Sequence, residues 1–141
     1  MQTETFENLV DTFEFLDDWE DRYRHVIELG KSMPPLDEGL KGPETKVDGC
    51  ASQVWLVPEI QDDQGTSAVT FRGDSDAMIV RGLIAILITL FSGKQASEIS
   101  KIDAKTEFAR LGLDQHLSAQ RSNGLKAMIA RVQAIAEAVQ R

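Results

Sequence analysis

The segment from Met78 to Phe91 is apolar on nearly every side, and it constrains the fold more than any other part of the chain. Its one charged residue is Arg81. A helix that is apolar all round is normally buried, so the segment predicts a central helix covered by other elements. It is too short for a membrane span, which needs about 20 apolar residues. We expect Ser75 or Asp76 as its N-cap and Gly93 as its end.

Two strand-like segments precede this helix. Residues 52–57 and 66–72 are rich in β-branched and aromatic side chains, and residues 66–72 alternate in polarity. Between them, residues 62–65 read Asp-Asp-Gln-Gly, a turn signal. The pattern predicts an antiparallel hairpin. A short extended piece at Lys46 and Val47 is a candidate third strand.

Helical periodicity accounts for most of the remaining chain. We expect a helix over residues 6–16 and a second that starts in a capping box of Asp17 and Glu20 and stops at Gly30. Short helices are expected at 96–99 and 104–111, followed by a long C-terminal helix with apolar residues at helical spacing. The predicted fold class is α+β, with helices packed on one face of a small antiparallel β-sheet in a single domain over residues 1–141.

Composition narrows the functional classes. The hydrophobic content of 42% is that of a globular chain. A net charge of -8 argues against nucleic-acid binding, which depends on neutralising phosphates with cations. We see no export signal at the N-terminus. Together with the single cysteine, this predicts a cytoplasmic protein with no membrane association.

Cys50 is the only cysteine of the chain. A disulfide within the chain and a multi-cysteine metal centre are therefore excluded. Two interpretations remain, a buried and inert thiol or a thiol presented for chemistry. The small residues Gly49, Ala51 and Ser52 around it favour a loop next to the predicted strand.

A reactive thiol needs a group that favours its thiolate form, such as a cation or a helix N-terminus. The candidates in this sequence are Arg121, Lys46 and the backbone amides near Ser75 and Asp76, although sequence alone places none of them beside Cys50. The chain has two histidines, His25 and His116, and neither lies in a known cysteine-protease or zinc-site pattern. No metal site is predicted.

Four ordered motifs resemble the SufE family of sulfur-acceptor proteins. The first covers residues 19–36, with Trp19, Tyr23, Gly30 and Pro34, and the second covers residues 47–56 around Cys50. The third runs from Phe71 through Gly73, Asp74, Ser75 and Asp76 to Leu83, and the fourth from Leu111 through His116 and Arg121 to Leu125. The resemblance covers almost the whole chain.

The resemblance implies a sulfur carrier that is not itself an enzyme. Its implied partner is a SufS-type cysteine desulfurase that holds the pyridoxal phosphate, so this chain is expected to bind no cofactor. Cys50 would take sulfur as a persulfide, activate the desulfurase and deliver the sulfur to an iron–sulfur scaffold complex. The implied fold resembles the IscU type. Gly49, Ser52, Asp74 and Arg121 are candidates for supporting the thiol loop or docking the partner.

Two other function classes stay open at this point. One is a scaffold that assembles an iron–sulfur cluster itself, for which one cysteine per chain is few. The other is a redox-active single-thiol protein, for which the chain offers no resolving cysteine. The particular desulfurase, the sulfur recipient and the formation of a homodimer are not determined by the sequence.

Overall fold

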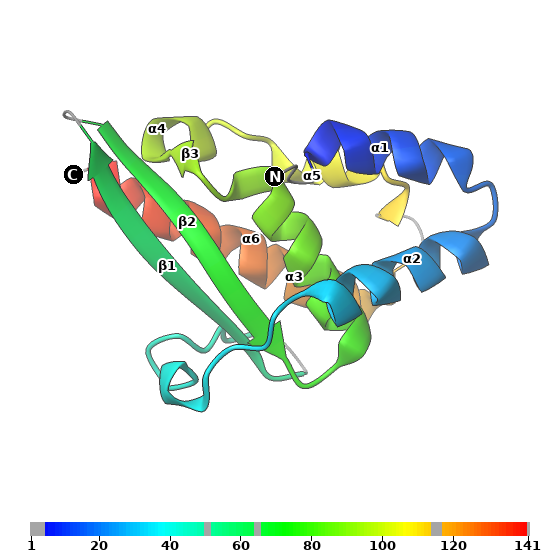
Figure 1. Cartoon of the computed structure of the whole chain (residues 1–141), viewed down its shortest axis with the longest axis horizontal. Helices are drawn as coiled ribbons and strands as arrows, with labels where there is room; N and C mark the ends of the chain where they lie inside the picture. The colour runs from blue at the N-terminus through cyan, green and yellow to red at the C-terminus, as the bar shows by residue number, and fades with distance from the viewer. Residues whose placement is uncertain (1–4, 50–51, 64–65, 114–116, 141) are drawn as a thin grey trace.

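A computed structural model describes residues 5–49, 52–63, 66–113 and 117–140. Its helices are α1 (Phe6–Phe15), α2 (Trp19–Ser32), the short 3-10 helix η1 (Glu38–Leu40), α3 (Met78–Phe91), α4 (Ala96–Ile99), α5 (Ala104–Ala109) and α6 (Ala119–Gln140). The strands are β1 (Val54–Asp63), β2 (Thr66–Ser75) and β3 (Lys94–Gln95). Figure 1 shows the long β1–β2 hairpin with α6 passing behind it, α3 beside it, and α1 and α2 on the far side of α3.

Helix α3 is the centre of the core, as its all-round apolar sequence predicts. It packs against α1, α2, α6 and β2. Leu83, Ile84, Ile86 and Leu87 are almost wholly buried. The helix ends at Phe91 with Ser92 as its C-cap, and the next residue is Gly93. Gly93 has a positive φ of 83°, which glycine adopts without strain.

The sheet is antiparallel and has three strands in the order β1-β2-β3. Register pairs run from Val54 opposite Ser75 to Asp63 opposite Thr66, so both strands are longer than the sequence pattern indicated. Val54, Leu56, Val69 and Phe71 turn toward the helices and are buried. The third strand is β3, which pairs with Ala68 and Val69 of β2, whereas Lys46 forms just one isolated bridge to Trp55. The predicted α+β architecture is confirmed.

Gly30 does not end α2, contrary to the sequence prediction, because the helix continues to Ser32. The glycine is needed for packing instead. A Cβ atom at Gly30 would lie 2.7 Å from the Met78 carbonyl oxygen, and one at Gly82 would lie 2.0 Å from the Val26 carbonyl oxygen. Real Cβ atoms do not approach other atoms this closely, so these glycines set the spacing between α2 and α3.

Both predicted helix caps at these elements are wrong. Helix α2 starts at Trp19 with Asp18 as N-cap and no side-chain cap hydrogen bond, so the expected capping box at Asp17 does not form. The N-cap of α3 is Ala77. Ser75 is the last residue of β2, and its Oγ accepts a hydrogen bond from the Ala77 amide. None of the described helices has the combination of length and apolar character needed to cross a bilayer.

Candidate functional site

The loop that carries Cys50 is closed by antiparallel backbone pairing on both sides. The Val47 amide donates to the Val54 carbonyl at 2.8 Å, and the Leu56 amide donates to the Thr45 carbonyl at 2.9 Å. Cys50 and Ala51 themselves lie outside the described residues, so the choice between a buried thiol and a presented thiol is not tested by the structure. The described flanks at Gly49 and Ser52 nevertheless fix where the loop starts and ends.

Helix α6 supports the incoming side of this loop. Gly49 has a φ of 92°, and a Cβ atom built on it would lie 3.3 Å from the Ala127 Cβ. One turn further along α6, the Arg131 guanidinium donates to the Lys46 carbonyl at 3.0 Å and to the Glu44 carbonyl at 2.6 Å. Arg131 therefore ties residues 44–46 to the helix that also contacts Gly49.

Asp76 holds the outgoing side of the loop. Its Oδ1 accepts a hydrogen bond from the Gln53 amide at 3.0 Å, and its own amide donates to the Gln53 carbonyl at 3.3 Å. Asp76 lies between β2 and α3, so this pair attaches the residue after Ser52 to the rigid end of the hairpin. Both partners are solvent-exposed.

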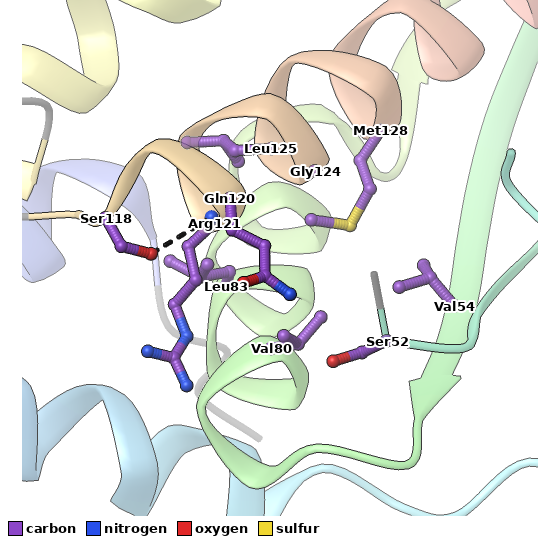
Figure 2. Close-up of a pocket in the computed structure, with 10 residues that line it drawn as sticks. All are labelled: Ser52, Val54, Val80, Leu83, Ser118, Gln120, Arg121, Gly124, Leu125 and Met128. Atoms are coloured by element: carbon purple, nitrogen blue, oxygen red, sulfur yellow. Dashed lines mark hydrogen bonds between the residues drawn. The ribbon is translucent and has the colours of Figure 1, made fainter. Parts of the chain in front are cut away.

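A cavity of about 120 Å³ lies between the outgoing loop, α3 and the first turns of α6. Figure 2 shows Ser52 on one side and Ser118, Gln120 and Arg121 on another. Its apolar wall is formed by Val54, Val80, Leu83, Leu125 and Met128. Ser52 is two residues from Cys50 in sequence, so the cavity adjoins the thiol loop.

Arg121 is the only charged residue among the described residues that line the cavity. Arg121 is half-buried, and its guanidinium has no hydrogen bond or ion pair with any other described residue. No aspartate or glutamate is found among the described residues that line the cavity. A cation left without a counter-charge in a partly enclosed site favours an anionic group beside it.

Asp74 lies outside this cavity and joins other segments. Its carboxylate accepts hydrogen bonds from the Leu36 amide at 3.0 Å and the Ser75 amide at 2.8 Å, and it forms a buried ion pair with Arg81. Lys41 lies 3.4 Å away. Burial by itself would raise the pKa of Asp74, but the two amide hydrogen bonds and the Arg81 pair together bring that pKa below its usual value.

The structure thus brings together three of the four predicted site residues other than Cys50. Ser52 and Arg121 line one cavity, and Gly49 contacts α6, the helix that carries Arg121. Asp74 supports residues 33–41 instead. Lys46 is exposed, and it contributes its carbonyl to Arg131.

The remaining sequence candidates lie elsewhere. His25 stacks edge-on against Phe13 in the α1–α2 interface with ring centroids 5.5 Å apart, and His116 lies outside the described residues. Sequence reasoning missed the loop contacts of Asp76, Ala127 and Arg131. Within the described ranges, no three His, Cys, Asp or Glu side chains are arranged to hold a metal ion.

Comparison with known proteins assigns the family. The model of the SufE family, described as an Fe-S metabolism associated domain, matches residues 7–136. The chain belongs to the SufE family. Its family description connects it with iron–sulfur metabolism.

Relatives and a solved structure agree with this assignment. A SufE-like protein of Rhizobium meliloti, named as uncharacterized, is 54% identical over 94% of this chain and 95% of its own length. A similarly named protein of Rhizobium etli is 55% identical over 91% of this chain and 86% of its own length. The solution structure of a hypothetical protein from Thermus thermophilus has a TM-score of 0.71 at 19% identity, covering 94% and 93% of the two chains. This last similarity supports the α+β fold.

The Asp74–Arg81 pair predicts a specific acid sensitivity for this SufE-family chain. Asp74→Asn should lower the free energy of unfolding by about 3–5 kcal/mol at neutral pH, because it leaves Arg81 buried without its counter-charge. The pKa of Asp74 in the folded chain lies below its unfolded value of about 3.9. The stabilisation of the fold by the ionised Asp74 is therefore complete above that unfolded value, and it is lost as pH falls toward the folded pKa.

Urea unfolding at several pH values between about 3 and 7 measures this effect. The stability of Asp74→Asn should fall less steeply with acid than that of the native chain. Asp37→Asn, at an exposed aspartate that caps η1 without a side-chain hydrogen bond, is the control and should behave as the native chain does. If the unfolding free energy of Asp74→Asn and that of the native chain changed equally with pH, the acid sensitivity would not come from the Asp74–Arg81 pair.

The Asp76–Gln53 contact predicts control of thiol access. Asp76→Ala removes the acceptor for the Gln53 amide, so we expect Cys50 to react faster with iodoacetamide while stability falls by only about 1 kcal/mol. Asp76→Asn keeps an oxygen acceptor at the same place and should react nearly as the native chain does. Alkylation followed by intact mass gives the rates. Unchanged rates in Asp76→Ala would show that this contact does not control access.

Proposed function

We propose that this protein accepts sulfur from a SufS-type cysteine desulfurase onto Cys50 and delivers it for iron–sulfur cluster assembly. The observation that carries the proposal is that Arg121, which has no ion pair with any described residue, lines a cavity bordered by Ser52, in a family associated with iron–sulfur metabolism. The cavity adjoins a loop whose central residue is the chain's one cysteine. Sulfur transfer to a single thiol needs no second cysteine.

The transfer is an exchange at sulfur. The Cys50 thiolate attacks the terminal sulfur of the desulfurase persulfide and forms a new sulfur–sulfur bond. The old sulfur–sulfur bond breaks, and the desulfurase cysteine leaves as a thiolate. Charge and atoms balance without an oxidant or reductant, and the terminal sulfur keeps its proton. The rate follows the thiolate fraction and the accessibility of the attacking sulfur.

Arg121 supplies the electrostatic part of this mechanism. A guanidinium stays charged at all physiological pH values, and a nearby cation favours thiolate over thiol. In the proposal the Arg121 guanidinium, which has no ion pair with a described residue, favours the Cys50 thiolate before transfer. A sulfur that entered this cavity would be bordered by the apolar Leu83, Leu125 and Met128, which would exclude water and strengthen that interaction.

The proposal assigns the cofactor chemistry to other proteins. Pyridoxal phosphate belongs to the desulfurase, and an iron–sulfur scaffold complex receives the sulfur, so this chain acts in the cytoplasm as carrier and activator. The anchors at Gln53 and Val47 support this role because they hold the described ends of the loop that carries Cys50.

A transfer assay tests the acceptor directly. After incubation with a SufS-type desulfurase and L-cysteine, the intact mass of the native chain should increase by one or more sulfur atoms. The gain should be reversed by reductant and absent in Cys50→Ser, which should keep the native melting temperature. No gain in the native chain, with a thiol that alkylates freely, would contradict the proposal for that desulfurase. A gain of iron and sulfide instead would favour a cluster scaffold.

The role of Arg121 has its own test. Arg121→Gln should slow alkylation of Cys50 about three- to tenfold at pH 7 and move the pH–rate profile to higher pH, because the thiolate is less favoured. Arg121→Lys should recover much of the rate. Lys126→Gln, which removes an exposed cation of α6 outside the cavity, is the control. If the pH–rate profile of Cys50 alkylation were the same in Arg121→Gln as in the native chain, this electrostatic role would be excluded.

A further inference from the structure

One end of the cavity beside Ser52 gathers side chains that can donate hydrogen bonds. The Ser52 hydroxyl, the Gln120 amide and the Arg121 guanidinium all line the cavity. Figure 2 shows the Gln120 side chain between Arg121 and Ser52. Among the described residues, neither the Gln120 side chain nor the Arg121 guanidinium has a hydrogen-bond or ion-pair partner. Three donor groups therefore meet at one end of the cavity, and at least two of them have no acceptor there.

The helix that carries these donors favours an anion. α6 contains the cations Arg121, Lys126 and Arg131 and a single acidic residue, Glu137, although the whole chain has a net charge of -8. Gln120 and Arg121 lie in its first turn, where the helix dipole places positive partial charge. A guanidinium binds an oxyanion through two parallel N–H bonds, which are stronger than hydrogen bonds between neutral groups. The donor end of the cavity therefore suits a small oxyanion.

The rest of the cavity lining is apolar, and it restricts which oxyanion fits. Val54, Val80 and Met128 contribute to it together with two leucines. The cavity volume of about 120 Å³ equals the volume of about four waters at ~30 Å³ each. An anion that is charged on every side would leave oxygens against the apolar lining without hydrogen bonds, which is unfavourable. An anion with one charged end and one polarisable end would satisfy both parts, since a thioether such as that of Met128 packs well against polarisable groups.

Thiosulfate has these two ends, a sulfonate group and a single outer sulfur. We propose that the cavity binds thiosulfate, and that the bound anion donates its outer sulfur to Cys50 without a desulfurase. The sulfonate accepts hydrogen bonds from Arg121, Gln120 and Ser52, and the outer sulfur lies on the apolar side. The inference rests on the proposed function in one respect, that Cys50 is a reactive thiol. It adds a second class of sulfur donor, a small inorganic anion.

The donation is a balanced exchange at sulfur. The Cys50 thiolate attacks the outer sulfur and forms a new sulfur–sulfur bond. The bond between the outer sulfur and the sulfonate sulfur breaks, and its electron pair leaves with sulfite. The product is a Cys50 persulfide in its anionic form, and no oxidant or reductant is consumed. Because a thiolate and a dianion repel each other, a cation beside both favours their reaction, and Arg121 supplies that cation.

Intact mass after incubation with thiosulfate alone tests the donation. The reduced and desalted native chain should gain one sulfur atom and release one sulfite for each sulfur gained, whereas Cys50→Ser should gain none. The rate should level off as thiosulfate rises through about 0.1–10 mM, because the cavity saturates, and sulfate at constant ionic strength should slow it by competition. No gain in a native chain whose thiol alkylates freely overturns the inference, and so does a rate that rises linearly over this range.

Variants of the donor groups separate anion binding from thiol reactivity. Arg121→Gln should lower the rate of sulfur gain from thiosulfate at least about tenfold more than it lowers the rate of alkylation by neutral iodoacetamide. Gln120→Ala keeps the cation and should lower the rate of sulfur gain about three- to tenfold, with alkylation unchanged. Lys126→Gln, outside the cavity, is the matched control. An equal loss of both rates in Arg121→Gln would overturn the inference, because Arg121 would then act on the thiol alone.

Binding is measured without the chemistry in Cys50→Ser. Thiosulfate should shift the NMR signals of the Ser52, Gln120 and Arg121 amides with saturation, and Arg121→Gln in the same background should abolish the shifts. Absence of saturable shifts overturns the inference. Transfer from a desulfurase without any binding or donation by thiosulfate would remove this inference and leave the proposed function in place. Donation by thiosulfate without transfer from a desulfurase would do the reverse.

Discussion

The buried pair of Asp74 and Arg81 is the interaction on which the arrangement around the thiol loop depends. Arg81 also donates to the carbonyls of Gly30 and Met33, so one side chain joins the end of α2 to the start of α3. Asp74 lies at the end of β2 and accepts a hydrogen bond from the Leu36 amide, so it connects these two segments to the pair. The pair can form because the two helices approach closely at Gly30 and Gly82. Removing either charge would leave the other buried without compensation.

Asp74 and Asp76 divide two tasks at the end of the hairpin. Asp74 is buried and holds residues 33–41 through the Leu36 amide, whereas Asp76 is exposed and holds the outgoing end of the thiol loop at Gln53. The first attachment is part of the core, and the second can break without disturbing it. In the proposed function, this separation lets the scaffold stay rigid while a partner engages the loop next to it.

Local periodicity was sufficient to predict the hairpin and α3, because burial on one face or on all faces leaves a regular pattern in the sequence. It failed where tertiary contacts decided the outcome. A glycine such as Gly30 can either end a helix or allow a second helix to pack closely against it, and the local sequence does not distinguish the two roles. The role of Gly30 is decided by its contacts with Met78 and Gly82, which are distant in sequence. Asp76 likewise is a residue type that often serves as an N-cap, but its carboxylate accepts a hydrogen bond from the Gln53 amide across the loop. Arg121 was only one of several candidate groups in the sequence, since no local pattern places it beside Ser52.

The attachments of the thiol loop differ in strength, which fits the proposed function of protecting and releasing sulfur. Backbone pairing between residues 45–47 and 54–56 belongs to the sheet edge and persists with it. The exposed Gln53–Asp76 contact contributes a net of only about 0.5–1.5 kcal/mol per hydrogen bond. A free energy of about 1.4 kcal/mol corresponds to a tenfold change in population, so a docking partner needs little binding energy to open this end. Opening there leaves Asp74, Arg81 and the core in place.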